Sequence, residues 1–307
     1  MSHPSASLVP MVEEAPARIF ARRAALRELA LVVALYAAYS ATRFVVGGDW
    51  GAARHHALQI LEVERWLHID IEQAVNHAVT PITAVSVFSA YWYATMHFIV
   101  TWTVLIVLYV RRPALYRPAR TALFAATFIA LFGYMFYPTA PPRLTAGFID
   151  TVSTTSQYGW WPSAAEQAQN ASTVTNQVAA MPSMHVGWAL WVSVVLACLA
   201  RRRWLKVLAF GYVATTTAVV VLTANHWLLD AVAGGALVLA CWWVAGRPYA
   251  SAVATGRRSG ARVAIPQDYA LAAAEAYSAA EMHEPPAVVE LREISSHERD
   301  TGRPPAA

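Results

Sequence analysis

Residues 183–245 read SMHVGWALWVSVVLACLARRRWLKVLAFGYVATTTAVVVLTANHWLLDAVAGGALVLACWWVA, and this stretch decides the fold. It holds three apolar runs, and a basic cluster at residues 201–206 separates the first two. Each run approaches the roughly 20 residues that a helix needs to cross a bilayer. A chain that crosses at His185 and returns at His226 covers about 40 residues, or two spans. Both imidazoles are therefore expected on one membrane face.

The composition of the whole chain is that of a membrane protein. Of its 307 residues, 57% are hydrophobic and only 14% are charged, and the mean hydropathy is +0.38, whereas soluble domains carry about 25% charged residues. The preference for Arg over Lys and the abundance of Ala suggest a GC-rich bacterial genome. Cys198 and Cys241 lie inside apolar runs, so neither a disulfide framework nor a cysteine metal site is expected. We expect membrane lipids, and no nucleic acid, as partners.

Six segments are long and apolar enough to be spans. They are residues 28–46, 85–110, 121–137, 183–200, 204–222 and 226–245. Arg-rich clusters precede the first span and follow every even-numbered one, so the positive-inside rule puts both termini in the cytoplasm. We predict an all-α integral membrane protein of the plasma membrane. Its predicted parts are a cytoplasmic N-terminal segment (1–27), a six-helix membrane domain (28–245) and a mostly disordered cytoplasmic tail (246–307) with a short helix at 270–282.

Two longer segments lie on the outer face in this topology. Residues 58–72 mix apolar with charged side chains, which predicts one or two helices lying flat on the membrane interface. Residues 138–182 form the second outer segment, in which Tyr158, Trp160 and Trp161 are expected to rest on the lipid headgroups.

Three short motifs converge on this outer face. YPTAPPR at 137–143 closes the third span, PSMH at 182–185 opens the fourth, and HWLLD at 226–230 opens the sixth. On a helix His226 and Asp230 are four residues apart and share one face. The carboxylate would then hold the tautomer of the imidazole, and neutral His226 could attack phosphorus.

The other motif residues suit the remaining tasks of a phosphoryl transfer. His185 could protonate the leaving oxygen, because imidazole titrates near neutrality. Ser183 fits the N-cap of the fourth span, where the positive helix end favours an anion. Arg143 can bind phosphate oxygens in a bidentate manner. Arg43 and His97 are further candidates, because ionisable residues at membrane depth usually face a cavity or a partner.

Together these residues resemble the type 2 phosphatidic acid phosphatase superfamily, and look most like its inositol phosphorylceramide synthase branch. The resemblance covers roughly residues 28–245 and rests on the three motifs in this order, with Gly234 following the last. It implies that His226 forms a phosphohistidine, that Asp230 orients it and that His185 is the acid and base. It also implies that Tyr137 and Arg143 belong to the substrate site, on the extracytoplasmic side, and that the enzyme acts on a lipid phosphate without a metal or another cofactor.

Three positions depart from the pattern of the wider family. Phe136 stands where a Lys is usual, and residues 219–223 lack the usual Ser-Arg pair. Two cations expected to bind phosphate are therefore missing, and Arg43 and His97 are candidates to replace them. Met184 replaces the usual Gly, as it does in the synthase branch, which favours a transferase or a specialised lipid phosphatase.

Several alternatives stay open at this point. The acceptor is either a hydroxyl, as in an inositolphosphotransferase, or water, as in a polyprenyl or glycerolipid phosphate phosphatase. A six-helix proton-coupled transporter would use the histidines as a relay, although the two halves show no internal repeat. A haem or metal protein would use His185 and His226 as ligands. The plainest alternative has both histidines bonded to backbone carbonyls, Arg143 as a loop cation, Arg43 snorkelling to the headgroups and His97 linking helices. Protein partners and oligomeric state are left open.

Overall fold

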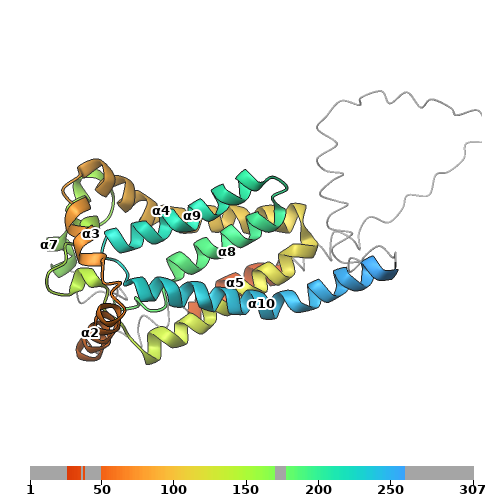
Figure 1. The fold of residues 1–307 in the computed structure, drawn as a ribbon, viewed down its shortest axis with the longest axis horizontal. Coiled ribbons are helices and arrows are strands. Elements are labelled where there is room, and N and C mark those ends of the chain that lie inside the picture. The colour runs from red at the N-terminus through yellow and green to blue at the C-terminus, as the bar shows by residue number, and fades with distance from the viewer. Residues whose placement is uncertain (1–25, 36, 39–49, 170–177, 260–307) are drawn as a thin grey trace, which may run out of the picture.

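The computed structural model describes residues 26–35, 37–38, 50–169 and 178–259, and Figure 1 shows their arrangement. Five long helices run side by side: α4 (Thr83–Arg111), α5 (Pro113–Phe136), α8 (Met184–Leu199), α9 (Arg203–Leu222) and α10 (Leu228–Ser259). The shorter elements are α2 (Trp50–Trp66), α3 (Glu72–Val79), η1 (Pro142–Leu144), α6 (Thr151–Thr154), η2 (Ser156–Tyr158) and α7 (Ala164–Gln169). In the described residues the only β pairing is an isolated bridge between Thr139 and Ala179. The predicted all-α class is confirmed.

Four of the described helices are long and apolar enough to cross a membrane. They are α4, α5, α9 and residues 228–246 of α10. α8 is apolar but has only 16 residues, because it begins after Ser183 and ends before the basic residues 201–203. Of the predicted first span, residues 28–35 and 37–38 are helical, and the rest lies outside the described residues. The structure thus supports four spans, and six spans with cytoplasmic termini remain a prediction.

Two helices extend beyond the predicted spans. α5 begins at Pro113 rather than at residue 121, because proline at the first helical position has its φ already set and lacks only an N–H that would be unpaired there. Arg117 and Arg120 therefore lie on this helix and not in a connecting loop. α10 continues to Ser259, past the predicted end at residue 245. The predicted tail from residue 260 on, with its short helix, lies outside the described residues.

The bundle is held together by an apolar core and by close helix contacts. α10 packs on α5 and α8, and α8 packs on α9. Trp191 is fully buried at the centre, where its indole N–H donates to the carbonyl of Ala119 over 2.7 Å. Nearer the end of the bundle at which α8 begins and α9 ends, called the outer end after its predicted orientation, a Cβ on Gly234 would lie 2.0 Å from the carbonyl oxygen of Ser183. Only glycine allows α10 to approach the start of α8 this closely.

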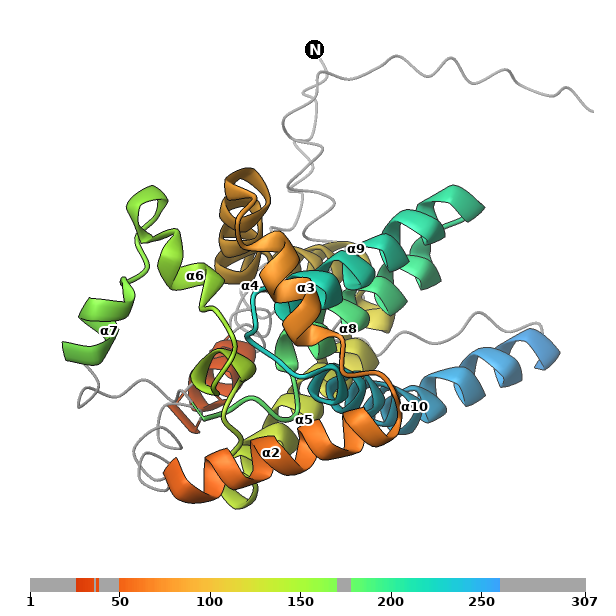
Figure 2. The ribbon, with the colours of Figure 1, turned by 60° about the vertical axis from the view of Figure 1, so that its left-hand side comes forward.

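α2 and α3 occupy the region predicted to form interfacial helices. Figure 2 shows α2 lying across one end of the bundle rather than along it, and α3 packs beside α9. Leu58, Val63 and Trp66 are exposed on α2, as a helix at a lipid interface requires. Glu64, on α2, and Glu72, on α3, are buried.

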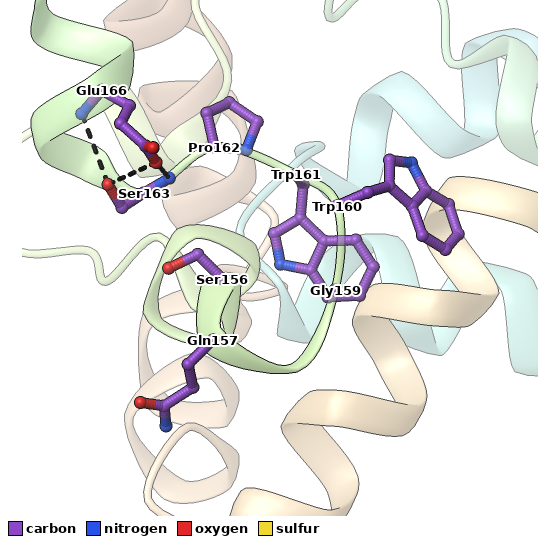
Figure 3. Close-up of a pocket in the computed structure, with 8 residues that line it drawn as sticks. All are labelled: Ser156, Gln157, Gly159, Trp160, Trp161, Pro162, Ser163 and Glu166. Atoms are coloured by element: carbon purple, nitrogen blue, oxygen red, sulfur yellow. Dashed lines mark hydrogen bonds between the residues drawn. The ribbon is translucent and has the colours of Figure 1, made fainter.

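The outer segment 138–182 contains η1, α6, η2 and α7, and residues 170–177 lie outside the described residues. Trp160 and Tyr158 are exposed, as headgroup contact requires, but Trp161 is only 9% exposed and packs edge-on against Tyr91. Figure 3 shows an open hollow in this segment, and no predicted site residue lines it. Its walls are Ser156, Gln157, Gly159, Trp160, Trp161, Pro162, Ser163 and Glu166.

Candidate active site

His226 lies in a tight turn between α9 and α10. Ala224 has a left-handed backbone conformation with φ of 56°, which ends α9, and the N–H groups of Asn225 and His226 both donate to the carbonyl of Val220. This turn buries the imidazole of His226 and directs its Nε2 toward His185, on the first turn of α8. The distance from His226 Nε2 to His185 Nδ1 is 3.4 Å. A residue of the turn between α9 and α10 thus meets a residue of α8 at one end of the bundle.

The other ring nitrogen of His226 fixes the tautomer. Its Nδ1 lies 2.9 Å from the carbonyl oxygen of Ala180 and 3.5 Å from Oδ2 of Asp230. Both neighbours are acceptors, so Nδ1 carries the proton and Nε2 presents its lone pair. Sequence reasoning assigned this orientation to Asp230 alone. In the structure the Ala180 carbonyl and Asp230 share this role, and the carbonyl is the nearer acceptor. Asp230 Oδ2 also accepts the N–H of Trp227 over 2.9 Å.

Arg143 lies beside the histidine turn, on η1. Its Nη1 donates to Oδ1 of Asn225 over 2.8 Å, and its backbone N–H donates to the carbonyl of Ala224. Its Nε is 3.5 Å from Oδ2 of Asp150, which offsets part of its positive charge. Sequence reasoning missed Asn225 and Asp150. The position of Asn225 directly before His226 was a usable signal, whereas nothing in the sequence placed Asp150 beside Arg143.

Ser183 and Tyr137 have different surroundings. Ser183 immediately precedes α8 and is buried; its N–H donates to the carbonyl of Asp230, and its hydroxyl has no partner among the described residues. Tyr137 points toward α2, where its ring stacks on His56 at 3.9 Å and its hydroxyl donates to Gln59. The structure therefore brings Ser183 to the histidine turn and places the Tyr137 hydroxyl toward a neighbouring helix.

His97 brings a third imidazole to the cluster, and Arg43 lies outside the described residues. The ring centroid of His97, on α4, is 4.3 Å from that of His185 in an edge contact. Tyr93, one turn earlier on α4, stacks on His185 at 4.3 Å. His97 Nδ1 is buried without a hydrogen-bond partner among the described residues. α4 therefore contacts His185 through two aromatic rings, those of Tyr93 and His97.

The three departures from the wider family add no positive charge. Phe136 is 73% exposed on the outside of the bundle. Val219, Val220, Val221 and Thr223 are buried at the end of α9. Met184 is partly buried, and its Cε would lie 3.4 Å from a Cβ added at Gly187. Among the described residues, Arg143 is the cation that stands at the histidine turn.

Glu64 and Glu72 are the largest omission of the sequence reasoning. Both are buried, at 0% and 1% exposure. Glu64 Oε1 accepts the N–H of Leu229 over 2.7 Å, and Glu72 Oε1 accepts the N–H of Leu228 over 2.9 Å. Burial, reinforced by the neighbouring Glu72 and Asp230 carboxylates, raises the pKa of Glu64 from its usual 4.5 to about 8. Two acids from the outer helices thus contact the turn that follows His226.

Fold and site together fit a multi-pass helical membrane protein with a histidine pair at one end of its bundle. A family model described as the PAP2 superfamily matches residues 58–244, more than half of the chain. The chain therefore belongs to the PAP2 superfamily, and this membership indicates a phosphatase-type or phosphotransferase-type enzyme. Neither the curated proteins nor the solved structures give a significant match.

Proposed function

We propose that this protein transfers the phosphoryl group of a membrane lipid phosphate through a covalent intermediate on His226, at the extracytoplasmic face. The observation that carries the proposal is the environment of His226. Two acceptors hold its Nδ1 proton, and the Nε2 lone pair faces His185 at 3.4 Å. A fixed tautomer with a second imidazole opposite is the arrangement that nucleophilic catalysis by histidine needs.

The reaction then has two steps. In the first, Nε2 of His226 attacks phosphorus, the P–N bond forms, and the P–O bond to the leaving group breaks as His185 donates a proton to the leaving oxygen. In the second, His185 takes a proton from the incoming water or hydroxyl, whose oxygen attacks phosphorus and displaces neutral His226. Asp230 and the Ala180 carbonyl stabilise the positive imidazole that exists between the steps.

Substrate entry requires a movement of His185. At 3.4 Å the facing nitrogens leave no room for a tetrahedral phosphoryl group between them. The His226 ring is fixed by its hydrogen bonds, whereas His185 contacts Tyr93 and His97 through ring stacking and edge contacts. We therefore assign the movement to His185 and propose that its ring rotates while it stays in contact with His97.

Charge and hydrogen-bond donors for the phosphate come from several elements. Arg143 lies within electrostatic range of His185 and keeps guanidinium N–H groups beyond the one that binds Asn225. The unpartnered hydroxyl of Ser183 and the first N–H groups of α8 add donors at the positive end of a helix. We also assign substrate binding to His97 and Arg43, and headgroup contact to Tyr137.

The acceptor is proposed to be a lipid or sugar hydroxyl, as in an inositolphosphotransferase. Met184, in the position where a hydrolase of the wider family has glycine, favours this assignment. Hydrolysis of a polyprenyl or glycerolipid phosphate is the second candidate. Reconstituted protein given labelled lipid phosphates, with and without alcohol acceptors, distinguishes the two by the labelled product, a phosphate ester of the added alcohol or free phosphate.

The decisive test is the variant His226→Ala, assayed in the presence of a chelator. Turnover is expected to fall by about 10³-fold or more, because the nucleophile is gone. His55→Ala removes an exposed histidine at the same end of the bundle and should leave turnover unchanged. His185→Ala should accumulate labelled phosphoenzyme. Undiminished turnover in His226→Ala, or no labelled protein in any variant, would contradict the proposal and favour the transporter or metal-binding alternatives.

A further inference from the structure

Three consecutive backbone N–H groups at the start of α10 each donate to a buried carboxylate. The donors are residues 227–229, and the acceptors are, in the same order, Asp230, Glu72 and Glu64 at 2.9, 2.9 and 2.7 Å. The three acids come from α10, α3 and α2. Free N–H groups at a helix start favour negative charge, but only about half an elementary charge is available there. Three ionised carboxylates exceed what this helix end can compensate.

Among the described residues no cation compensates the charge of the two glutamates. Within the described residues neither Glu64 nor Glu72 forms an ion pair with Arg, Lys or His, and Asp230 faces His226 alone. Oε2 of Glu64 and Oδ1 of Asp230 are buried with no hydrogen-bond partner in the same part of the chain. An uncompensated buried carboxylate costs several kcal/mol, and binding a proton removes that cost.

We propose that Glu64 and Glu72 form an acid pair that retains one proton and positions the turn carrying His226 and Asp230. The groups that face Glu64 are Glu72 from α3 and Asp230 from α10, and both are acids. Their repulsion and the burial of Glu64 are the reasons that its pKa rises to about 8. Since neither glutamate contacts the reacting atoms, both are positioning residues.

The acid pair gives α2 and α3, which lie outside the bundle, a role at the turn that carries His226. α2 lies across the bundle end, and the hydrogen bond from Leu229 N–H to Glu64 joins it to α10. When Glu64 loses its proton, a third negative charge at the helix start repels Asp230 and the turn. Above about pH 8 we therefore expect His226 to lose its alignment, and turnover to fall.

Infrared spectroscopy tests the proton without any substrate. On full-length purified protein, the difference spectrum between about pH 6 and about pH 10 should show a protonated carboxyl C=O band that disappears with a midpoint near 8. The band should be absent in Glu64→Gln and present in the control Glu62→Gln, an exposed acid on the same helix. Glu72→Gln removes a neighbouring negative charge, so the midpoint should move to lower pH.

Turnover tests the positioning role, and this part rests on the proposed function. In the wild type the turnover number should fall about tenfold for each pH unit above the Glu64 midpoint. Glu64→Gln keeps an oxygen acceptor for Leu229 but cannot ionise, so its turnover should stay flat over the same range. Glu64→Ala should lower kcat at every pH and leave KM nearly unchanged.

The outcomes separate the two proposals. If the turnover of Glu64→Gln falls at alkaline pH as steeply as that of the wild type, the acid pair is overturned. A carboxyl band that does not change in the Glu64 and Glu72 variants overturns it as well. Because the infrared measurement needs no turnover, a band that behaves as expected in an enzyme inactive on every lipid phosphate would sink the proposed function and leave the acid pair standing.

Discussion

The middle of the bundle and its outer end are built on different principles. In the middle, α4, α5, α8 and α10 share a cluster of apolar side chains, among them Leu108, Leu123, Trp191, Val192 and Val238. At the outer end, beside a smaller apolar cluster around Trp227, many buried side chains are polar or charged: Glu64, Glu72, Asn76, Thr223, Asn225, His226 and Asp230. Apolar contacts are non-directional and tolerate rearrangement, whereas buried polar groups must each find a partner. Apolar packing in the middle holds the helices together, whereas hydrogen bonds at the outer end set the positions of individual polar groups.

Asn76 illustrates how the outer end achieves this. Its Nδ2 donates to the carbonyls of Ile149 and Leu222, and its Oδ1 accepts the N–H of Ile149. One side chain from α3 thus joins the loop before α6 to the end of α9. Bonds of this kind connect segments far apart in the sequence, and this one anchors the end of α9 directly before the histidine turn.

Gly234→Ala should have the largest effect, because Gly234 lies where the two regions meet. Its new Cβ would lie 2.0 Å from the Ser183 carbonyl, so α8 and α10 must separate. Both thermal stability and turnover on a lipid phosphate should drop sharply, with turnover reduced at least 10²-fold. Gly246→Ala, on the same helix with nothing within 4 Å of the added carbon, is the matched control. Normal turnover in Gly234→Ala would show that the site does not depend on this contact.

Asp230→Asn should have the next largest effect, confined to the outer end. The amide keeps the shape and an oxygen for the Trp227 N–H but removes the negative charge near His226 Nδ1. A loss in turnover of about 10²- to 10⁴-fold is expected, with the thermal unfolding midpoint close to that of the wild type. A loss much below tenfold would mean that the Ala180 carbonyl alone orients the imidazole.

The sequence was sufficient for the apolar region and for part of the site. Length and hydropathy located the runs that became α4, α5, α8, α9 and α10, because a helix in lipid must satisfy its own backbone. Proximity of His226 and Asp230 was predicted from a spacing of four residues on a helix; the two side chains do lie 3.5 Å apart, but His226 is in the turn before α10 and only Asp230 is on the helix. His97 was found because a buried ionisable side chain in an apolar run usually faces a partner, and the structure places it against His185.

Other contacts could not be predicted, for physical reasons that differ. Ala180 contributes a backbone carbonyl, which every residue has, so its identity carries no signal. Glu64 and Glu72 follow the spacing of an ordinary polar helix face, and only the fold brings the N–H groups of α10 onto that face. Asp150 reaches Arg143 through a loop path that periodicity does not encode. Polar contacts across loops depend on tertiary geometry.

Trp191→Ala should have the smallest effect on turnover, and it tests the comparison from the apolar side. Removing this fully buried side chain leaves a cavity and deprives the Ala119 carbonyl of its donor, which should cost about 3–5 kcal/mol of stability. Because no catalytic contact is touched, turnover per folded molecule should stay within about twofold of the wild type. Trp204→Ala, an exposed tryptophan at the start of α9, should change neither quantity. If Trp191→Ala lowered turnover as far as Asp230→Asn does, the outer end would depend on the detailed packing of the middle, and the two regions could not be treated as separately built.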